Sequence, residues 1–178
     1  MTVSGCIGQV KSSSSGNEAS FVESVNTDGY QDTNVKISSS IVDRQIDKES
    51  TAKIRITVTW AGRENQRVTF GNSVPFSTPK YPESDENIVL LDSDREYEMV
   101  EDGNWIPKTG ESGSLQTGEL VLSVAELSPD QSVSHSWEIW GNPESSSYIE
   151  KGEYGFSDSI GLGGEGDTVD WSLSVTIR

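Results

Sequence analysis

The chain has one cysteine and one histidine, and both shortages exclude kinds of site. Cys6 has no second cysteine to pair with, so no internal disulfide can hold the fold together. A zinc site made of several cysteine and histidine ligands is not expected. His135 is the one base available to a Ser-His-Asp triad, and no Gly-x-Ser-x-Gly motif presents a nucleophile. We therefore predict no catalytic residues, no metal site and no cofactor.

Basic residues are also scarce. Lysine and arginine number 13 against 29 aspartates and glutamates, which gives a net charge of −16. A surface this negative repels phosphate backbones, so nucleic acid is not an expected partner. High net charge often accompanies disorder, but five tryptophans and long alternating apolar segments favour a folded chain. We favour adaptation to high salt, where self-repulsion is screened, over a merely acidic protein.

Long apolar runs are absent, and the longest are short pieces such as Ile88–Leu91, so no transmembrane helix is expected. Nor does any segment show the pattern of an amphipathic helix. The chain has strict alternation instead: Ile54, Ile56, Val58 and Trp60 are separated by polar residues. The closing segment, 169–177, alternates in the same way. This period of two predicts strands with one buried and one wet face.

These strands, separated by turn signals, predict an all-β fold, an immunoglobulin-like antiparallel β-sandwich formed by one domain over residues 20–178. A closed barrel is the alternative. The turn at 61–65 and the apolar segment Val68–Phe70 predict that 68–70 pairs with the strand ending at Trp60. His135 is expected in a strand near the edge of the core. The residues predicted to fill the core are Val58, Trp60, Trp137, Ile139, Tyr154, Trp171 and Leu173.

The N-terminal region, residues 1–19, is predicted to be a flexible tether. Val3–Cys6 has the form of a lipobox, in which Cys6 would carry a lipid. The polar stretch Lys11–Glu18 resembles a linker that holds a domain away from a membrane. The alternative is a disordered tail with a stray cysteine. We expect an extracellular monomer, anchored to the outer face of the membrane if Cys6 is lipidated.

One acidic segment has the spacing of a calcium loop, since Asp92, Asp94 and Glu96 alternate. An EF-hand loop needs glycine at its sixth position, which is Tyr97 here, and it needs flanking helices. We therefore favour a solvated loop. Carboxylate pairs for glycoside hydrolysis are abundant, which makes any chosen pair uninformative.

An interaction surface is predicted around the proline-rich segment 74–82, whose three prolines limit the entropy lost on binding. Trp137 and Trp140 lie three positions apart, so we expect them on opposite faces of a strand, with Trp140 directed outward. A core or inter-loop packing role is nevertheless favoured for Trp140, and a simple strand crossover is the alternative role for the prolines. The residues proposed for this surface are Val74, Pro75, Phe76, Tyr81, Trp105 and Trp140.

The second half also resembles a known family. Leu127–Ser132, the strand ending at Trp140, and Ile149–Phe156 are similar to the layout L-x-P-G-E-S, W, L-x-P-G-x-Y of BsuPI-like intracellular proteinase inhibitors. Secreted or lipid-anchored proteins of halophilic archaea share it, with segments like 74–77 and 105–107. The resemblance covers roughly residues 54–177 and implies an immunoglobulin-like sandwich. Asp130 and Gln131 stand where the layout has glycine and glutamate, and Glu150 and Lys151 replace its apolar-proline pair.

Three functions are compatible with this sequence. The first is a non-catalytic binding domain for a protein or polysaccharide at the cell surface. The resemblance implies the second, a protease inhibitor that would act through the 74–82 loop. A hydrolase that uses acidic residues is a distant third.

Overall fold

The computed structural model describes residues 19–29, 34–71, 80–83, 87–101, 104–109, 115, 123–144, 149–163 and 167–178. Every regular element in these ranges is a β-strand, and all strand pairs are antiparallel. In this part of the chain no helix is present that could cross a membrane. The prediction of an all-β antiparallel sandwich is confirmed.

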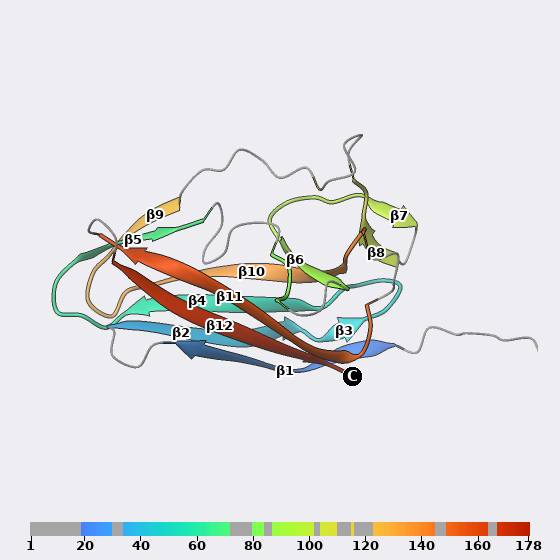
Figure 1. Ribbon diagram of the computed structural model, residues 1–178, viewed down its shortest axis with the longest axis horizontal. Helices are drawn as coiled ribbons and strands as arrows, with labels where there is room; N and C mark the ends of the chain where they lie inside the picture. Colours follow the sequence, from blue (N-terminus) through green and yellow to red (C-terminus); the bar gives the residue numbers. More distant parts are fainter. Residues whose placement is uncertain are drawn as a thin grey trace, which may run out of the picture.

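The strands form two main sheets and a small hairpin (Figure 1). The six-stranded sheet has the order β3 (Gln45–Ile46), β1 (Ser20–Gly29), β12 (Thr168–Ile177), β11 (Gly152–Leu162), β5 (Gln66–Phe70) and β9 (Ser123–Leu127). The four-stranded sheet has the order β2 (Val35–Asp43), β4 (Lys53–Trp60), β10 (Ser132–Gly141) and β6 (Ile88–Asp92). The hairpin pairs β7 (Met99–Glu101) with β8 (Asn104–Pro107).

The core lies between the two sheets, where alternate residues of each strand meet. In β4 the inward residues are fully buried except for Trp60, which is nearly so, while the residues between them stay at least partly exposed. The closing strand β12 shows the same alternation. All seven residues predicted for the core are buried: Val58, Trp60, Trp137, Ile139, Tyr154, Trp171 and Leu173.

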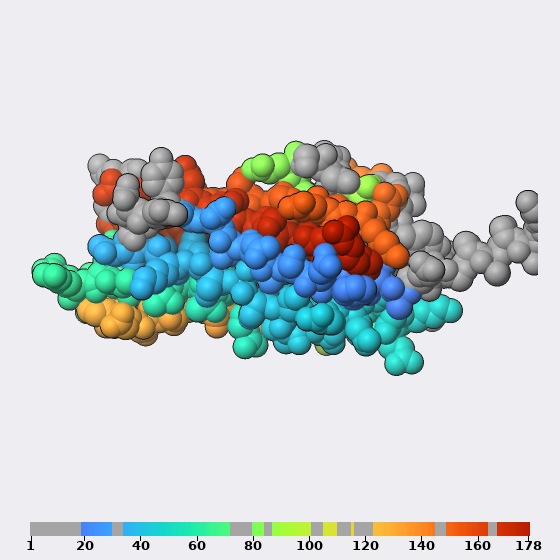
Figure 2. Space-filling model, turned by 90° about the horizontal axis from the view of Figure 1, so that it is seen from below, coloured from blue at the N-terminus to red at the C-terminus, as the bar shows by residue number. Residues whose placement is uncertain are grey.

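One long edge of the sandwich joins β1 to β2. The hydroxyl of Thr27 donates a hydrogen bond to the carbonyl of Ile37, which links the two sheets. In Figure 2 the blue β1 and the light-blue β2 lie side by side along this edge. The segment Lys80–Glu83 links the other side: Lys80 bridges to Leu90 of β6, and the amide of Glu83 bonds the carbonyl of Gly155 in β11.

The predicted pairing of Val68–Phe70 with β4 is wrong. These residues form β5, which lies in the other sheet between β11 and β9. The chain between Trp60 and Gln66 crosses from one sheet to the other, so the turn at 61–65 is not a hairpin turn. Val68 and Phe70 are nevertheless buried, because the core lies between the sheets and both sheets contribute to it.

The hairpin β7–β8 lies at one end of the sandwich, and β5 and β9 lie at the opposite end (Figure 1). The outer surface of the four-stranded sheet therefore has one part that the hairpin covers and another that it does not. Strand β8 contacts β10, so the hairpin covers the end of the sheet near Gly141. The end near Ser132 lies away from the hairpin.

Candidate functional site

The outer surface of the four-stranded sheet presents a row of hydroxyl side chains. The register places Ser38, Thr57 and Ser134 side by side on β2, β4 and β10, with Ser40, Arg55 and Ser136 in the next row. On the other side of the first row come Lys36, Thr59 and Ser132. These positions alternate with the buried ones, so their side chains point outward. We call these nine residues the hydroxyl face: Lys36, Ser38, Ser40, Arg55, Thr57, Thr59, Ser132, Ser134 and Ser136.

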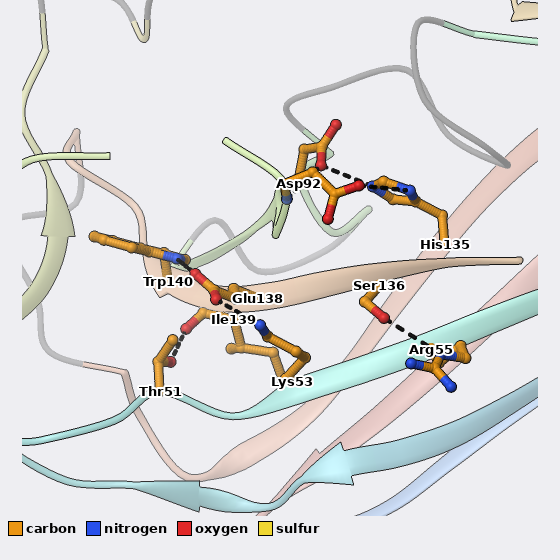
Figure 3. Close-up of polar contacts among 10 residues, drawn as sticks. Thr51, Lys53, Arg55, Asp92, His135, Ser136, Glu138, Ile139 and Trp140 are labelled. Carbon is orange, nitrogen blue, oxygen red and sulfur yellow. Dashed lines mark hydrogen bonds and ion pairs between the residues drawn. The ribbon is translucent and has the colours of Figure 1, made fainter. Parts of the chain in front are cut away.

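The hydroxyl face contains two cations and no carboxylate. Lys36 and Arg55 are exposed, and neither forms an ion pair with a carboxylate among the described residues. Arg55 instead lies 3.4 Å from the Ser136 hydroxyl through its Nε (Figure 3). Five other cations each have a carboxylate partner: Lys53, Lys80, Arg95, Lys108 and Arg178. The positive charge of the face is therefore available to a ligand.

The outer surface of the six-stranded sheet provides the contrast. Ser172, Ser174 and Thr176 of β12 point outward, as do the hydroxyls of the opposite face. Their neighbours across the strands include carboxylates, not cations: Asp28 lies opposite Ser172, and Glu153 lies opposite Thr176. Asp170 of β12 is also exposed. The hydroxyl face and the outer side of β12 therefore share a hydroxyl pattern, but the first has cations among its hydroxyls and the second has carboxylates.

An aromatic cluster covers the rest of the four-stranded sheet. Its buried members are Val89, Leu91, Leu115 and Trp140, and the partly buried members packed on them are Tyr81, Tyr97, Met99 and Trp105. Trp140 meets Trp105 edge to face, with ring centroids 5.2 Å apart, and Tyr97 at 5.8 Å. The outward orientation expected for Trp140 is correct, and so is the packing role favoured for it, whereas its candidacy as an exposed surface residue is wrong. The ring is only 3% exposed because the hairpin covers it.

The structure brings three of the predicted surface residues together, since Tyr81, Trp105 and Trp140 belong to this cluster. Val74, Pro75 and Phe76 lie outside the described residues, as does Cys6. Of the residues predicted for the interaction surface, Tyr81 and Trp105 are described and partly exposed, and they pack on the buried members of the cluster. Trp105 is anchored there, since its indole Nε1 donates to the carbonyl of Asp47 at 2.7 Å.

A polar row separates the cluster from the hydroxyl face. Lys53 and Glu138 pair across β4 and β10 at 3.1 Å, and Glu138 also accepts a hydrogen bond from Trp140 Nε1 at 3.1 Å (Figure 3). The charges of Lys53 and Glu138 are therefore paired with each other. The hydroxyl face thus begins beyond this pair, which lies between it and the aromatic cluster.

A second polar constellation lies on the inner side of the sheet, where β6 ends. Oδ1 of Asp92 lies 2.7 Å from Nε2 of His135, and the carboxyl group of Asp92 is buried (Figure 3). Asp94, in the turn after β6, faces the other ring nitrogen of His135 at 3.9 Å. His135 is a strand residue with 18% of its side chain exposed, as predicted for the edge of the core.

Sequence reasoning placed Asp92 and Asp94 in a solvated loop and did not connect them to His135. The register of β6 on β10 makes the connection, because it places Asp92 opposite Trp137, two residues from His135. The apolar run that ends at Asp92 gave no signal for this contact, because all five residues of β6 are buried and the run does not alternate. Val89 and Leu91 pack in the aromatic cluster, whereas Ile88 and Leu90 pack in the main core.

Both ring nitrogens of His135 face carboxylates, and this arrangement limits its chemistry. The base of a Ser-His-Asp triad needs one nitrogen directed at a hydroxyl nucleophile and the other at the acid. Here Nε2 bonds Asp92, and Nδ1 faces the exposed carboxylate of Asp94 at 3.9 Å. The constellation can hold a proton or a cation between the imidazole and the carboxylates.

Two further groups near the cluster have shifted acidities. Burial raises the pKa of the Tyr97 hydroxyl above its ordinary value of 10.0. Backbone amides of Glu49 and Ser50 donate to the Asp47 carboxylate and lower its pKa. The lowered pKa of Asp47 keeps that carboxylate ionised, and the carbonyl of the same residue holds Trp105.

Comparisons with protein-family models, with curated proteins and with solved structures find no match to this chain.

Proposed function

We propose that the protein is a non-catalytic, salt-adapted binding domain that acts outside the cell and takes an acidic polysaccharide on its hydroxyl face. The observation that carries the proposal is the contrast in charge between the two outer surfaces. On a chain of net charge −16, one sheet presents exposed Lys36 and Arg55 among seven hydroxyls, and the opposite sheet presents carboxylates.

The chemistry of the face suits a sugar polymer. Hydroxyl side chains both donate and accept hydrogen bonds, as sugar hydroxyls do. Lys36 and Arg55 lie four register positions apart on neighbouring strands, roughly 14 Å between Cα atoms for ordinary strand spacing. They would contact two separate acidic groups of an extended polymer. The Lys53–Glu138 pair borders the face on the side of the aromatic cluster, and the end near Ser132 lies away from the hairpin.

A polysaccharide fits the net charge better than a nucleic acid does. Double-stranded DNA carries one charge per about 1.7 Å, whereas an acidic polysaccharide carries its charges on separate sugar rings. The sparser polymer is repelled less by a chain of −16. The repulsion that remains is long-ranged and is screened at high salt, where the Debye length falls to about 3 Å at 1 M. Contacts at hydrogen-bond distance lie within that length.

Titration calorimetry with polygalacturonate tests the proposal, with neutral dextran as the matched polymer. We expect binding of polygalacturonate, stronger at about 0.5 M than at 0.05 M sodium chloride, and none of dextran. The double variant Lys36→Gln/Arg55→Gln should bind about 2- to 30-fold more weakly, since an exposed charge contributes about 0.2–1 kcal/mol. The control Lys48→Gln/Arg67→Gln removes the same charge elsewhere. Equal weakening by both pairs, or equal binding of dextran, contradicts the proposal.

The location of the domain is part of the same proposal. A lipid on Cys6 would hold it at the outer face of the membrane, because two acyl chains on one residue give stable anchoring. The native product should then partition with membranes, and Cys6→Ser should release it. Equal solubility of both forms contradicts the anchor. Inhibition of a protease through the 74–82 loop stays a prediction from the resemblance alone.

A further inference from the structure

The two ring nitrogens of His135 lie at different distances from the carboxylates that they face. Oδ1 of Asp92 lies 2.7 Å from Nε2, within the range of a direct hydrogen bond, and it also accepts the backbone N–H of Asp94. This bond engages Nε2 of the ring. The other ring nitrogen, Nδ1, faces Oδ2 of Asp94.

This second contact has the wrong length for a hydrogen bond. Nδ1 and Oδ2 of Asp94 are 3.9 Å apart, beyond the 2.7–3.2 Å expected of N–H···O bonds. A gap of this length leaves room for a cation between the two atoms. A tetrahedral zinc ion with bonds of about 2.0–2.1 Å holds its nitrogen and oxygen ligands roughly 3.3 Å apart. The turn residue Asp94, whose side chain is 79% exposed, would need to move by only about 0.6 Å.

Asp92 is placed to orient the imidazole ring of His135. Metal-binding histidines usually donate their other N–H to a carboxylate or carbonyl, which fixes the ring and its tautomer. Asp92 is 5% exposed, and no other carboxylate among the described residues is buried. Its second oxygen lies 3.9 Å from Nε of Arg95, and the amide of Ser93 bonds the carbonyl of Ser136, which fixes the turn on β10. Burial of this carboxylate is costly without such partners.

We propose that Nδ1 of His135 and the carboxylate of Asp94 bind a zinc ion, with Asp92 orienting the imidazole. The three residues offer donor atoms within 4.8 Å of one another. One imidazole and one ligating carboxylate suit zinc better than calcium, which takes six to eight oxygen ligands. Two zinc positions remain for water, so the site is open to solvent on the Asp94 side. The proposal does not rest on polysaccharide binding, because the hydroxyl face is on the other side of the sheet.

The test uses the full chain without a histidine tag, with Cys6→Ser as the background to remove the thiol ligand. His135 is the one histidine, so nitrogen-15 spectra of the imidazole report on this site alone. At pH 7.5 we expect one zinc ion per chain, a shift of the Nδ1 resonance on adding zinc chloride, and retention of the proton on Nε2. This reading needs no variant to fold.

Titration calorimetry with zinc chloride then compares variants. His135→Gln should abolish binding, Asp94→Asn should weaken it at least tenfold, and Asp92→Asn should weaken it about 10- to 100-fold through the orientation of the ring. Glu96→Gln changes an exposed acid of the same segment and should leave binding unchanged. Zinc binding undiminished in His135→Gln overturns the proposal. So does an Nδ1 that is protonated before zinc is added and stays so afterwards, because the gap then holds a proton.

Discussion

Trp105 and Trp140 meet edge to face at an interplanar angle of 86°, and this contact fixes the hairpin on the four-stranded sheet. Trp105 also donates to the carbonyl of Asp47, which ties the hairpin to the segment after β3. Trp105→Ala removes both interactions, so we expect a loss of about 2–4 kcal/mol in the free energy of unfolding.

Urea denaturation measures this loss as a lower midpoint at constant slope. Trp105→Phe keeps the ring contact and loses the hydrogen bond, so its loss should be smaller, about 1–2 kcal/mol. A midpoint for Trp105→Ala within error of the wild type contradicts a structural role for the cluster.

Gly62 is predicted to be intolerant of a side chain. A Cβ at this position would lie 2.2 Å from the Trp60 ring, whose Nε1 is held by the carbonyl of Glu64 at 2.6 Å. Gly62→Ala should displace the ring and cost about 1–3 kcal/mol. Gly29→Ala is the matched control, because nothing lies within 4 Å of its Cβ. Thermal melts that show equal effects of the two substitutions contradict the packing described for Trp60.

Stability above pH 10 should depend on Tyr97. Burial raises the pKa of its hydroxyl in the folded state above the unfolded value of 10.0. The contribution of the neutral hydroxyl is therefore complete below pH 10 and is lost as the pH rises through the folded pKa. Melting temperatures of the wild type should fall relative to those of Tyr97→Phe between pH 9 and pH 11. A difference that stays constant over this range contradicts the burial of the hydroxyl.

Salt should stabilise the folded chain. Folding brings carboxylates closer together on a chain of net charge −16, and added salt screens their repulsion. We expect the melting temperature to rise as sodium chloride increases from 0.05 M to about 2 M. The triple variant Asp28→Asn/Glu153→Gln/Asp170→Asn removes three negative charges from the outer surface of the six-stranded sheet. Its melting temperature should rise less with salt. A flat or falling melting temperature for the wild type removes the salt-adapted interpretation.

The alternation of apolar residues was enough to predict the sandwich and its core. A period of two is a local property, and Trp60, Trp137 and Trp171 are all buried where it places them. It does not say which strand pairs with which, and this is why β5 was assigned to the wrong sheet. Pairing depends on contacts between distant segments, such as Gly161 of β11 with Thr69 of β5.

The same limit applies to the candidate sites. Asp92 and His135 are 43 residues apart, and only the register of β6 on β10 brings them together. Trp140 was correctly placed on the outer side of its strand, but the hairpin that covers it comes from residues 99–107. At Asp130 the sequence held a signal for the backbone conformation of the turn that the prediction did not use. It stands where the layout that the sequence resembles has glycine, and its φ of 62° lies in the left-handed region that glycine favours and aspartate tolerates.

Whether the hydroxyl face takes an acidic polysaccharide is decided by mapping the bound ligand on the chain. Amide resonances of a nitrogen-15-labelled sample are followed while short polygalacturonate oligomers are added in 0.5 M sodium chloride. We expect the largest shifts in the middle row of the face, at Ser38, Thr57 and Ser134, and no change at Ser172 and Ser174 of the opposite sheet. Shifts confined to the opposite sheet, or no shifts at a saturating concentration, would contradict it.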